Sequence, residues 1–202
     1  MKIQKECFLL KDGRGAVMRS PEDADAEKML KYLHDTARET DFLLRTPQES
    51  GRYSAEKERA LFAKLNADER SAMVLCLVEG RIVGVCQISA SDRVKTAHRA
   101  GIGIAVLKEF WGLGIGTRLL EKITDIGREI KGVIQLELEF IEGNSRACAL
   151  YEKAGFRTVG VHPNAVRMSD GALRHEYLMI KEIEWQKQPC AYARGCFNAG
   201  RL

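Results

Sequence analysis

The stretch of sequence that decides the fold is Phe110-Trp111-Gly112-Leu113-Gly114-Ile115-Gly116-Thr117-Arg118-Leu119-Leu120. It places three glycines between an apolar run and an amphipathic helix whose apolar residues recur at helical spacing. Backbone N–H groups at the start of a helix have no partner within it, carry a partial positive charge, and are left uncovered by glycine. Such a turn can hold an anion, so the sequence indicates a site for the pyrophosphate of a cofactor.

Two other nucleotide-binding motifs fit this turn less well. A P-loop closes on Lys followed by Ser or Thr, whereas Thr117-Arg118 follows the glycines here. A dinucleotide fingerprint needs its last glycine where Thr117 stands, and its first glycine close behind the strand, but residues 107–111 intervene. Glu137 and Glu139 stand near the place of a ribose-binding acid, so a Rossmann-type dinucleotide site stays open as an alternative.

A second motif follows one helix and one strand later. It runs Leu136-Glu137-Leu138-Glu139-Phe140-Ile141-Glu142-Gly143-Asn144-Ser145-Arg146-Ala147-Cys148-Ala149-Leu150-Tyr151-Glu152-Lys153-Ala154-Gly155-Phe156. Together the two segments resemble the GNAT family of acetyl-CoA-dependent N-acetyltransferases. That family has a Gln/Arg-x-x-Gly-x-Gly/Ala loop, then Leu-Glu-Val, Asn, and Leu-Tyr-Glu-Lys-x-Gly-Phe in this order. The resemblance covers roughly residues 70–181.

One position departs from the family pattern. Trp111 stands where the family carries Gln or Arg. Because the loop binds mainly through backbone amides, we expect the site to be retained and Trp111 to pack over the turn.

The resemblance implies a GNAT-type acyl-CoA N-acyltransferase fold of the α/β (α+β) class, with a central mixed, mostly antiparallel sheet and helices on both faces. The sequence pattern agrees, because hairpin signals occur at both ends, around Asp12-Gly13 and Asp170-Gly171, and helices alternate with strands between them. Ser20 is expected to cap the first helix, with Pro21 at its first position. We expect residues 1–184 to form a single domain and residues 185–202, where the pattern is lost, to form a disordered C-terminal appendage.

Composition narrows the class of protein. The chain has 202 residues, of which 45% are hydrophobic and 30% charged, and this fits one soluble domain with a sizeable core. No apolar run approaches the roughly 20 residues that span a bilayer, and no charged-then-apolar leader opens the sequence, so we expect a cytoplasmic protein without a membrane partner. The net charge of +4 is too small and too dispersed to predict a nucleic-acid partner. The six cysteines form no Cys-x-x-Cys pair, so we expect no metal site.

The resemblance also implies how acetyl-CoA would be held. The backbone of six residues would anchor its pyrophosphate: Gly112, Leu113, Gly114, Ile115, Gly116 and Thr117. A backbone N–H at the end of the preceding strand, where a bulge splays two neighbouring strands, would polarise the thioester carbonyl. By position that segment is Ile104, Ala105 and Val106, and Val106 is our preferred donor. Such a donor contributes about 3 kcal/mol to transition-state stabilisation.

Two side chains are assigned catalytic roles on the same basis. Tyr151 would protonate the departing thiolate, since a phenol with a pKa near 10 stays protonated at neutral pH. Asn144 lies two helical turns before it, so both can face the cofactor. Glu139 is the preferred base, and the alternative is a solvated surface acid; Glu137 shares its strand face. The spacing Glu139, Asn144, Tyr151 is similar to that of ribosomal-protein alanine N-acetyltransferases within the family.

The remaining assignments are broader. Candidates for the acceptor site are Glu39, Thr40, Asp41, Phe42, His162, Arg167 and Tyr177, and candidates for the outer phosphates are Arg118, Lys122 and Arg146. We expect an N-acetyltransferase that moves an acetyl group from acetyl-CoA to a primary amine by direct attack, without a metal. An α-amine is favoured because its pKa near 8 leaves part of it neutral. The alternative is a non-catalytic GNAT-like acyl-CoA-binding or regulatory module. The acceptor's identity and the oligomeric state stay open, a homodimer included.

Overall fold

The computed structural model describes residues 1–184, and the predicted appendage, residues 185–202, lies outside them. The strands are β1 (Glu6–Leu9), β2 (Gly15–Arg19), β3 (Ser71–Val78), β4 (Arg81–Ala90), β5 (Arg99–Val106), β6 (Gln135–Ile141), β7 (Arg157–Arg167) and β8 (Leu173–Glu182). The α-helices are α1 (Ala26–Glu39), α2 (Ala55–Ala67), α3 (Ile115–Glu129) and α4 (Ser145–Lys153). Short 3₁₀ turns are η1 (Asp23–Asp25), η2 (Pro47–Arg52), η3 (Val94–Thr96) and η4 (Lys108–Phe110).

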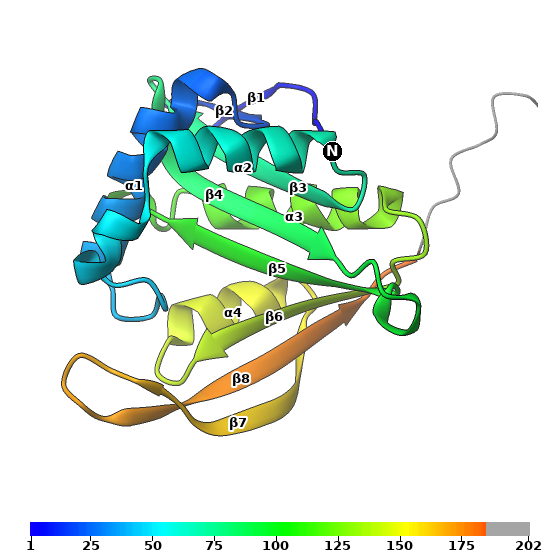
Figure 1. The fold of residues 1–202 in the computed structure, drawn as a ribbon. Helices are drawn as coiled ribbons and strands as arrows, with labels where there is room; N and C mark the ends of the chain where they lie inside the picture. Colours follow the sequence, from blue (N-terminus) through cyan, green and yellow to red (C-terminus); the bar gives the residue numbers. More distant parts are fainter. Residues whose placement is uncertain (185–202) are drawn as a thin grey trace, which may run out of the picture.

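All eight strands join one open sheet in the order β1-β2-β3-β4-β5-β6-β8-β7 (Figure 1). Every neighbouring pair is antiparallel except β5 and β6, which run parallel. The predicted mixed, mostly antiparallel sheet is therefore confirmed, as are the hairpins at both ends of the chain.

Helices cover both faces of the sheet. Figure 1 shows α1 and α2 in front of β3 and β4, with α3 behind them. On β6, Leu136 packs against Gly127 of α3, and the Phe140 ring lies 6.2 Å from the ring of Tyr151 on α4. Leu136 and Phe140 are an even number of residues apart and share one strand face, so α3 and α4 lie on the same side of the sheet.

The core forms where the sequence pattern places it. On α3 the residues at helical spacing, Leu119, Leu120, Ile123 and Ile126, are all buried. Strand β3 is buried along its whole length, because helices cover it on both faces and strands flank it on both edges.

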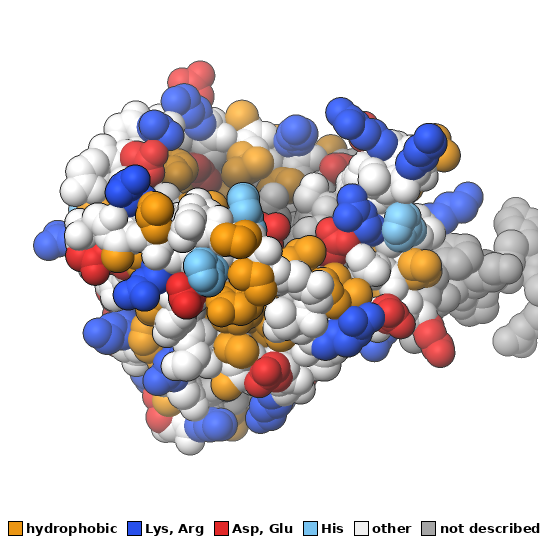
Figure 2. Space-filling model, turned by 90° about the horizontal axis from the view of Figure 1, so that it is seen from below, with side chains coloured by type: hydrophobic (Ala, Val, Ile, Leu, Met, Phe, Trp, Pro, Cys, Tyr) orange, Lys and Arg blue, Asp and Glu red, His pale blue; other side chains and the backbone are white. Residues whose placement is uncertain are grey.

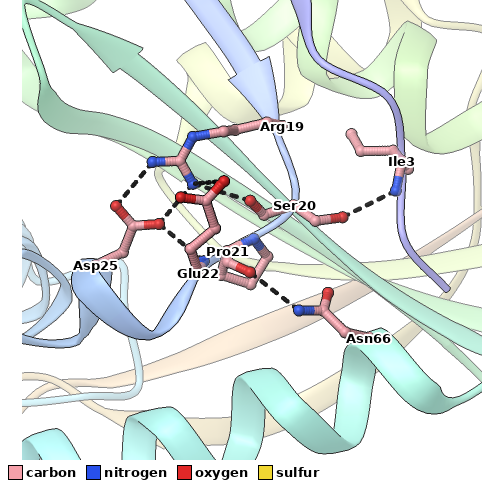
Figure 3. Close-up of polar contacts among 7 residues, drawn as sticks. All are labelled: Ile3, Arg19, Ser20, Pro21, Glu22, Asp25 and Asn66. Carbon is pink, nitrogen blue, oxygen red and sulfur yellow. Dashed lines mark hydrogen bonds and ion pairs between the residues drawn. The ribbon is translucent and has the colours of Figure 1, made fainter.

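The start of α1 corrects the prediction that Ser20 caps this helix. The Ser20 hydroxyl instead accepts a hydrogen bond from the N–H of Ile3 at 2.9 Å (Figure 3). The turn η1 precedes α1, and its N-cap residue is Glu22, whose N–H donates to the Asp25 carboxylate at 2.9 Å. Arg19 holds the same carboxylate through two hydrogen bonds, of 2.5 and 2.8 Å. The helix therefore begins later than predicted, since the Ser20 oxygen serves the N-terminal segment.

The sheet opens between β5 and β6. Their pairing ends at Gly101 and Glu137, whereas β6 stays paired with β8 as far as Ile141 and therefore diverges from β5 together with β8. The bulge predicted at this point of β5 is not there, because the register between β4 and β5 is unbroken. The irregularity lies one strand further, where Val83 of β4 has no partner on β3. Loss of pairing, and not a bulge in β5, produces the opening.

Candidate active site

A cleft of about 1340 Å³ runs through this opening and along the glycine turn. Its walls come from β4, β5, β6, the turn, and the helices α1, α2 and α4. It is lined by all the predicted catalytic and acetyl-CoA-binding residues except Leu113: Ile104, Ala105, Val106, Gly112, Gly114, Ile115, Gly116, Thr117, Glu139, Asn144 and Tyr151. The carbonyl of Leu113 accepts from the N–H of Lys11 at 3.3 Å, and its side chain packs on the core.

The glycine turn presents free backbone donors to the cleft. Gly114, with φ of +94°, is the N-cap of α3, and the first helical bond runs from the N–H of Arg118 to its carbonyl at 3.1 Å. Within residues 1–184, none of the amides from Gly112 to Thr117 donates to a protein acceptor. A positive φ at this cap favours glycine, which adopts it without the strain that a side chain imposes. Free N–H groups at the start of a 15-residue helix are the arrangement to which anions bind in proteins.

The end of β5 also directs N–H groups into the opening. The N–H of Leu107 donates to Val83 at 2.9 Å, and bonded and non-bonded pairs alternate along an antiparallel ladder. With the register unbroken, Ala105 bonds to β4, and the N–H groups of Ile104 and Val106 point to the side that β6 has left.

Two aromatic donors hold this strand end. The Tyr32 hydroxyl on α1 donates to the carbonyl of Ala105 at 2.7 Å. The Trp111 indole donates to the carbonyl of Val106, also at 2.7 Å. Two successive peptide groups are thereby fixed by side chains from different segments, and the N–H of Val106 is fixed with them.

Tyr151 is buried but reaches the cleft. Its ring lies among Phe140 and Phe156, with centroids 6.2 and 6.3 Å away. Burial raises the pKa of the Tyr151 phenol above its ordinary value, with a smaller contribution from Cys86, so the hydroxyl is protonated at neutral pH. Within residues 1–184 the hydroxyl has no hydrogen-bond partner. It is therefore a proton donor available to a ligand in the cleft.

Asn144 has a structural task as well. Its side-chain oxygen accepts from the N–H of Ala147 at 3.2 Å, which makes it the N-cap of α4.

The two glutamates on β6 differ in their surroundings. Glu137 accepts hydrogen bonds from Arg99 at 3.2 Å and from Gln135 at 2.7 Å. Glu139 lines the cleft and has no such partner within the described part of the chain. Glu176 on β8 lies beside it, and burial, followed by repulsion from Glu139, raises the pKa of the Glu176 carboxyl. Two carboxyl groups therefore face the opening together.

The acceptor-site candidates divide into two groups. Glu39, Thr40 and Phe42 line the cleft. Asp41, His162, Arg167 and Tyr177 do not line it: Asp41 accepts from the Ser169 hydroxyl, His162 is exposed, Arg167 donates to Gly171, and Tyr177 stacks on Phe140 at 5.2 Å. Tyr177 was misplaced because β8 turns it to the α4 side of the sheet, whereas its neighbour Glu176 faces the cleft.

The candidates for the outer phosphates divide similarly. Arg146 lines the cleft and stacks over the Trp111 ring, 4.8 Å from its centroid. Arg118 instead lies over Phe8, and Lys122 pairs with Glu6 at 3.2 Å. Both side chains lie on the side of α3 that faces β1, away from the cleft.

The cleft also contains polar residues that the sequence did not lead us to predict, among them Tyr32, Arg45, Glu58 and Glu176. Spacing offered a signal for Glu58, which precedes the apolar residues Leu61 and Phe62 by three and four positions and so shares their helix face.

Two features are absent from the part of the chain that the structure describes. Over residues 1–184, no group of three or more His, Cys, Asp or Glu side chains is placed to hold a metal ion. Among the described helices, none is long and apolar enough to cross a membrane.

Curated proteins similar to this chain are amine acetyltransferases. The [ribosomal protein bS18]-alanine N-acetyltransferase of Salmonella typhimurium is 31% identical over 131 residues, which are 65% of this chain and 76% of that enzyme. An N-alpha-acetyltransferase of Sulfurisphaera tokodaii is 32% identical over 99 residues, or 45% of this chain. That match spans 59% of the archaeal enzyme, less than two thirds of its length.

Solved structures share the fold. The acetyltransferase of the GNAT family from Streptococcus pneumoniae superposes with a TM-score of 0.78 at 25% identity, over 83% of this chain and 99% of that one. The ribosomal L7/L12 alpha-N-protein acetyltransferase RimL, solved with coenzyme A, gives 0.70 at 16% identity, over 85% and 96%. The model of the acetyltransferase (GNAT) family matches residues 30–156. This chain therefore belongs to the GNAT family of acetyltransferases.

Proposed function

We propose that this chain transfers an acetyl group from acetyl-CoA directly to a primary amine, with residues 1–184 as a single catalytic domain. Its partners are then acetyl-CoA and the amine acceptor, without nucleic acid or membrane, and its compartment is the cytoplasm. The observation that carries the proposal is the continuity of one cleft from the free amides at Gly112–Thr117 to the hydroxyl of Tyr151 and the carboxylate of Glu139.

The charges along the cleft support this assignment. Lys11, Arg146 and Lys153 line the part near the glycine turn and α4, where an anionic cofactor binds. Four carboxylates line the part that faces α1, α2 and β8: Glu39, Glu58, Glu139 and Glu176. A positive potential at one end and a negative potential at the other suit an anionic donor and a cationic acceptor.

The mechanism follows from the positions of these groups. Glu139 takes a proton from the acceptor ammonium through water, and the neutral amine attacks the thioester carbonyl. A C–N bond forms, and the N–H of Val106 donates to the oxyanion, a contribution of about 3 kcal/mol. As the C–S bond breaks, Tyr151 donates its proton to the thiolate, whose conjugate acid has a pKa near 8.5, and the nitrogen loses its second proton, which restores the Tyr151 hydroxyl as the amide forms.

An α-amine is the acceptor we propose. The relatives from Salmonella and Sulfurisphaera are named as α-amine or alanine N-acetyltransferases. An α-amine with a pKa near 8 needs little help from a base at cellular pH, whereas a lysine amine near 10.4 needs much more.

The test is thiol release from acetyl-CoA with alanine-initiated peptides and free amines, using Tyr151→Phe as the variant and Tyr177→Phe as the matched control. We expect kcat for Tyr151→Phe to fall by about 10²-fold or more, with the affinity for acetyl-CoA within about twofold. Tyr177→Phe lies outside the cleft and should behave as wild type. An unchanged rate in Tyr151→Phe removes this residue from the mechanism. Acetyl-CoA binding without turnover of any amine supports the non-catalytic module instead.

A homodimer stays a prediction. Figure 2 views the molecule from below and shows hydrophobic side chains at the surface there. The exposed apolar residues on β7 and β8 are Val159, Val161 and Leu173. Because β7 is an edge strand, a second copy is the partner we propose for it, and light scattering tests this.

A further inference from the structure

The part of the cleft between α1, α2 and strands β3 to β5, the acceptor lobe, holds a buried acid that the mechanism does not use. Glu58 on α2 is only 6% exposed, yet it lines the cleft. Within residues 1–184 its carboxylate has no hydrogen bond or ion pair, and burial raises the pKa of this group. A buried carboxylate without a partner is costly to the fold, which points to a cationic ligand.

Arg45 lines the same lobe and also has an unused group. One of its terminal nitrogens donates to the Thr36 hydroxyl at 3.0 Å. Its Nε is fully enclosed and has no acceptor among the described residues. The guanidinium is near enough to lower the pKa of Glu58, but no ion pair within 4.0 Å joins the two. Because Arg45 also lines the cleft, a ligand here meets a carboxylate that accepts and a guanidinium that donates through its terminal nitrogens.

The walls and dimensions of the lobe constrain that ligand further. Its apolar lining comes from Met29, Leu33, Leu61 and Met73. Because α2 packs on β3, Glu58 lies about two strand spacings, or about 10 Å, from the opening beyond β5. An aliphatic stem with a charged end fits such a wall.

We propose that Glu58 and Arg45 form a subsite for the second residue of a peptide acceptor, and that this residue is lysine or arginine. Glu58 binds the cationic end of its side chain, the apolar wall contacts the stem, and Arg45 donates to a peptide carbonyl. A polyamine offers no oxygen to Arg45, so the pairing of the two charges favours a peptide. The inference rests on the proposed acetyl transfer and adds a preference in the acceptor to it.

The experiment compares peptides that begin Ala-Lys, Ala-Met and Ala-Glu, together with spermidine, by thiol release from acetyl-CoA. For wild type, kcat/KM should be at least about tenfold higher for Ala-Lys than for Ala-Met, and lowest for Ala-Glu. Glu58→Gln should reduce the Ala-Lys to Ala-Met ratio to about one. Glu56→Gln is the matched control, because Glu56 is an exposed acid two residues before Glu58 on α2. This variant should keep the wild-type ratio.

Melting without any ligand separates a binding role from a structural one. Removing an unpaired buried charge should raise the Tm of Glu58→Gln at pH 7, and the gain should shrink as the pH falls and the wild-type carboxyl is protonated. A lower Tm would mean that Glu58 serves a structural pair with Arg45, and this overturns the inference. Equal rates for Ala-Lys and Ala-Met in wild type, or faster acetylation of spermidine, overturn it while leaving acetyl transfer intact. No turnover of any amine overturns the proposed function itself.

Discussion

The indole N–H of Trp111 donates to the carbonyl of Val106 at 2.7 Å, which ties the entrance of the glycine turn to the end of β5. The same peptide segment carries the N–H that we assign to the thioester oxyanion. Trp111 also supports Arg146, whose guanidinium lies 4.8 Å from the ring centroid. This residue therefore positions the donor and a cation at once, in the place where most of the family has Gln or Arg.

Replacing Trp111 with Phe tests this positioning role. Phe keeps a ring under Arg146 but cannot donate to the Val106 carbonyl, so the peptide group after Val106 is released and the N–H of Val106 is held only through the Ala105 carbonyl, which Tyr32 binds. We expect kcat to fall about tenfold, since a misplaced oxyanion donor loses part of its contribution, while KM for acetyl-CoA changes by less than about threefold. Steady-state kinetics measure both constants. A change confined to KM would show that Trp111 acts only through cofactor binding.

Gly114 gives a prediction about the backbone of the turn. Its φ is +94°, and a Cβ built there meets nothing within 4 Å, so a side chain adds strain without a clash. We expect Gly114→Ala to lower the free energy of unfolding by about 1–2 kcal/mol and to weaken acetyl-CoA binding. Urea unfolding and ligand-induced thermal shifts measure the two effects.

Gly15 on β2 is the matched control for this variant. It also has open space around its Cβ position, but its φ lies outside the left-handed region. Gly15→Ala should leave stability equal or slightly higher. An equal loss of unfolding free energy in Gly114→Ala and Gly15→Ala would contradict the argument from backbone strain.

The local signals of the sequence predicted most of the architecture, because they depend on near neighbours along the chain. The glycine turn, the apolar residues at helical spacing on α3 and the hairpin turns at Asp12-Gly13 and Asp170-Gly171 are of this kind. Ser20 failed as a cap because its oxygen is taken by Ile3, 17 residues away. The opening between β5 and β6 also depends on a distant element, since β8 draws β6 aside. Pairings over such distances leave no local pattern to read.

The candidate site likewise combines residues that local sequence signals indicate with residues that only long-range packing brings in. The free amides at Gly112–Thr117 could be located from the sequence because the signals for a helix start are local. Glu58 and Arg45 enter the cleft through the packing of α2 and the segment before it against the sheet, and their lack of partners is a property of the folded state alone.

The two acids on β6 allow a test of the catalytic base, because Glu137 can serve as the control for Glu139. Glu139→Gln should lower kcat for an α-amine at pH 7 by about 10²-fold, the usual size of general base catalysis. The defect should shrink toward pH 9, because an amine with a pKa near 8 is then neutral without help. Glu137→Gln, whose wild-type carboxylate is held by Arg99 and Gln135, should retain its rate. An equal loss of kcat in both variants would mean that the negative charge of this strand face affects the rate, and not a base at Glu139.

The ion pair between Arg19 and Asp25 yields a prediction on stability and pH. Burial pushes the pKa of Asp25 up, but the hydrogen bonds from Arg19 and from the N–H of Glu22 outweigh it, so the pKa lies below its ordinary value. Asp25→Asn leaves Arg19 without its counter-charge, and we expect the free energy of unfolding to fall by about 3 kcal/mol at pH 7. Because the folded-state pKa is depressed, this stabilisation is present above the unfolded pKa near 3.9 and is lost as the pH falls through the folded value.

The difference between wild type and Asp25→Asn should therefore narrow below about pH 4. Urea unfolding at pH 7, 5 and 3 measures it. Asp125→Asn is the control, since its pair with Arg128 is exposed to solvent and should contribute about 0.5 kcal/mol or less at any of these pH values. Lys31→Ala removes another exposed pair, with Asp35, and should behave like that control. A constant difference from pH 7 to pH 3 would mean that Asp25 stabilises the start of α1 through its shape and neutral hydrogen bonds, because only a charged carboxylate responds to protonation.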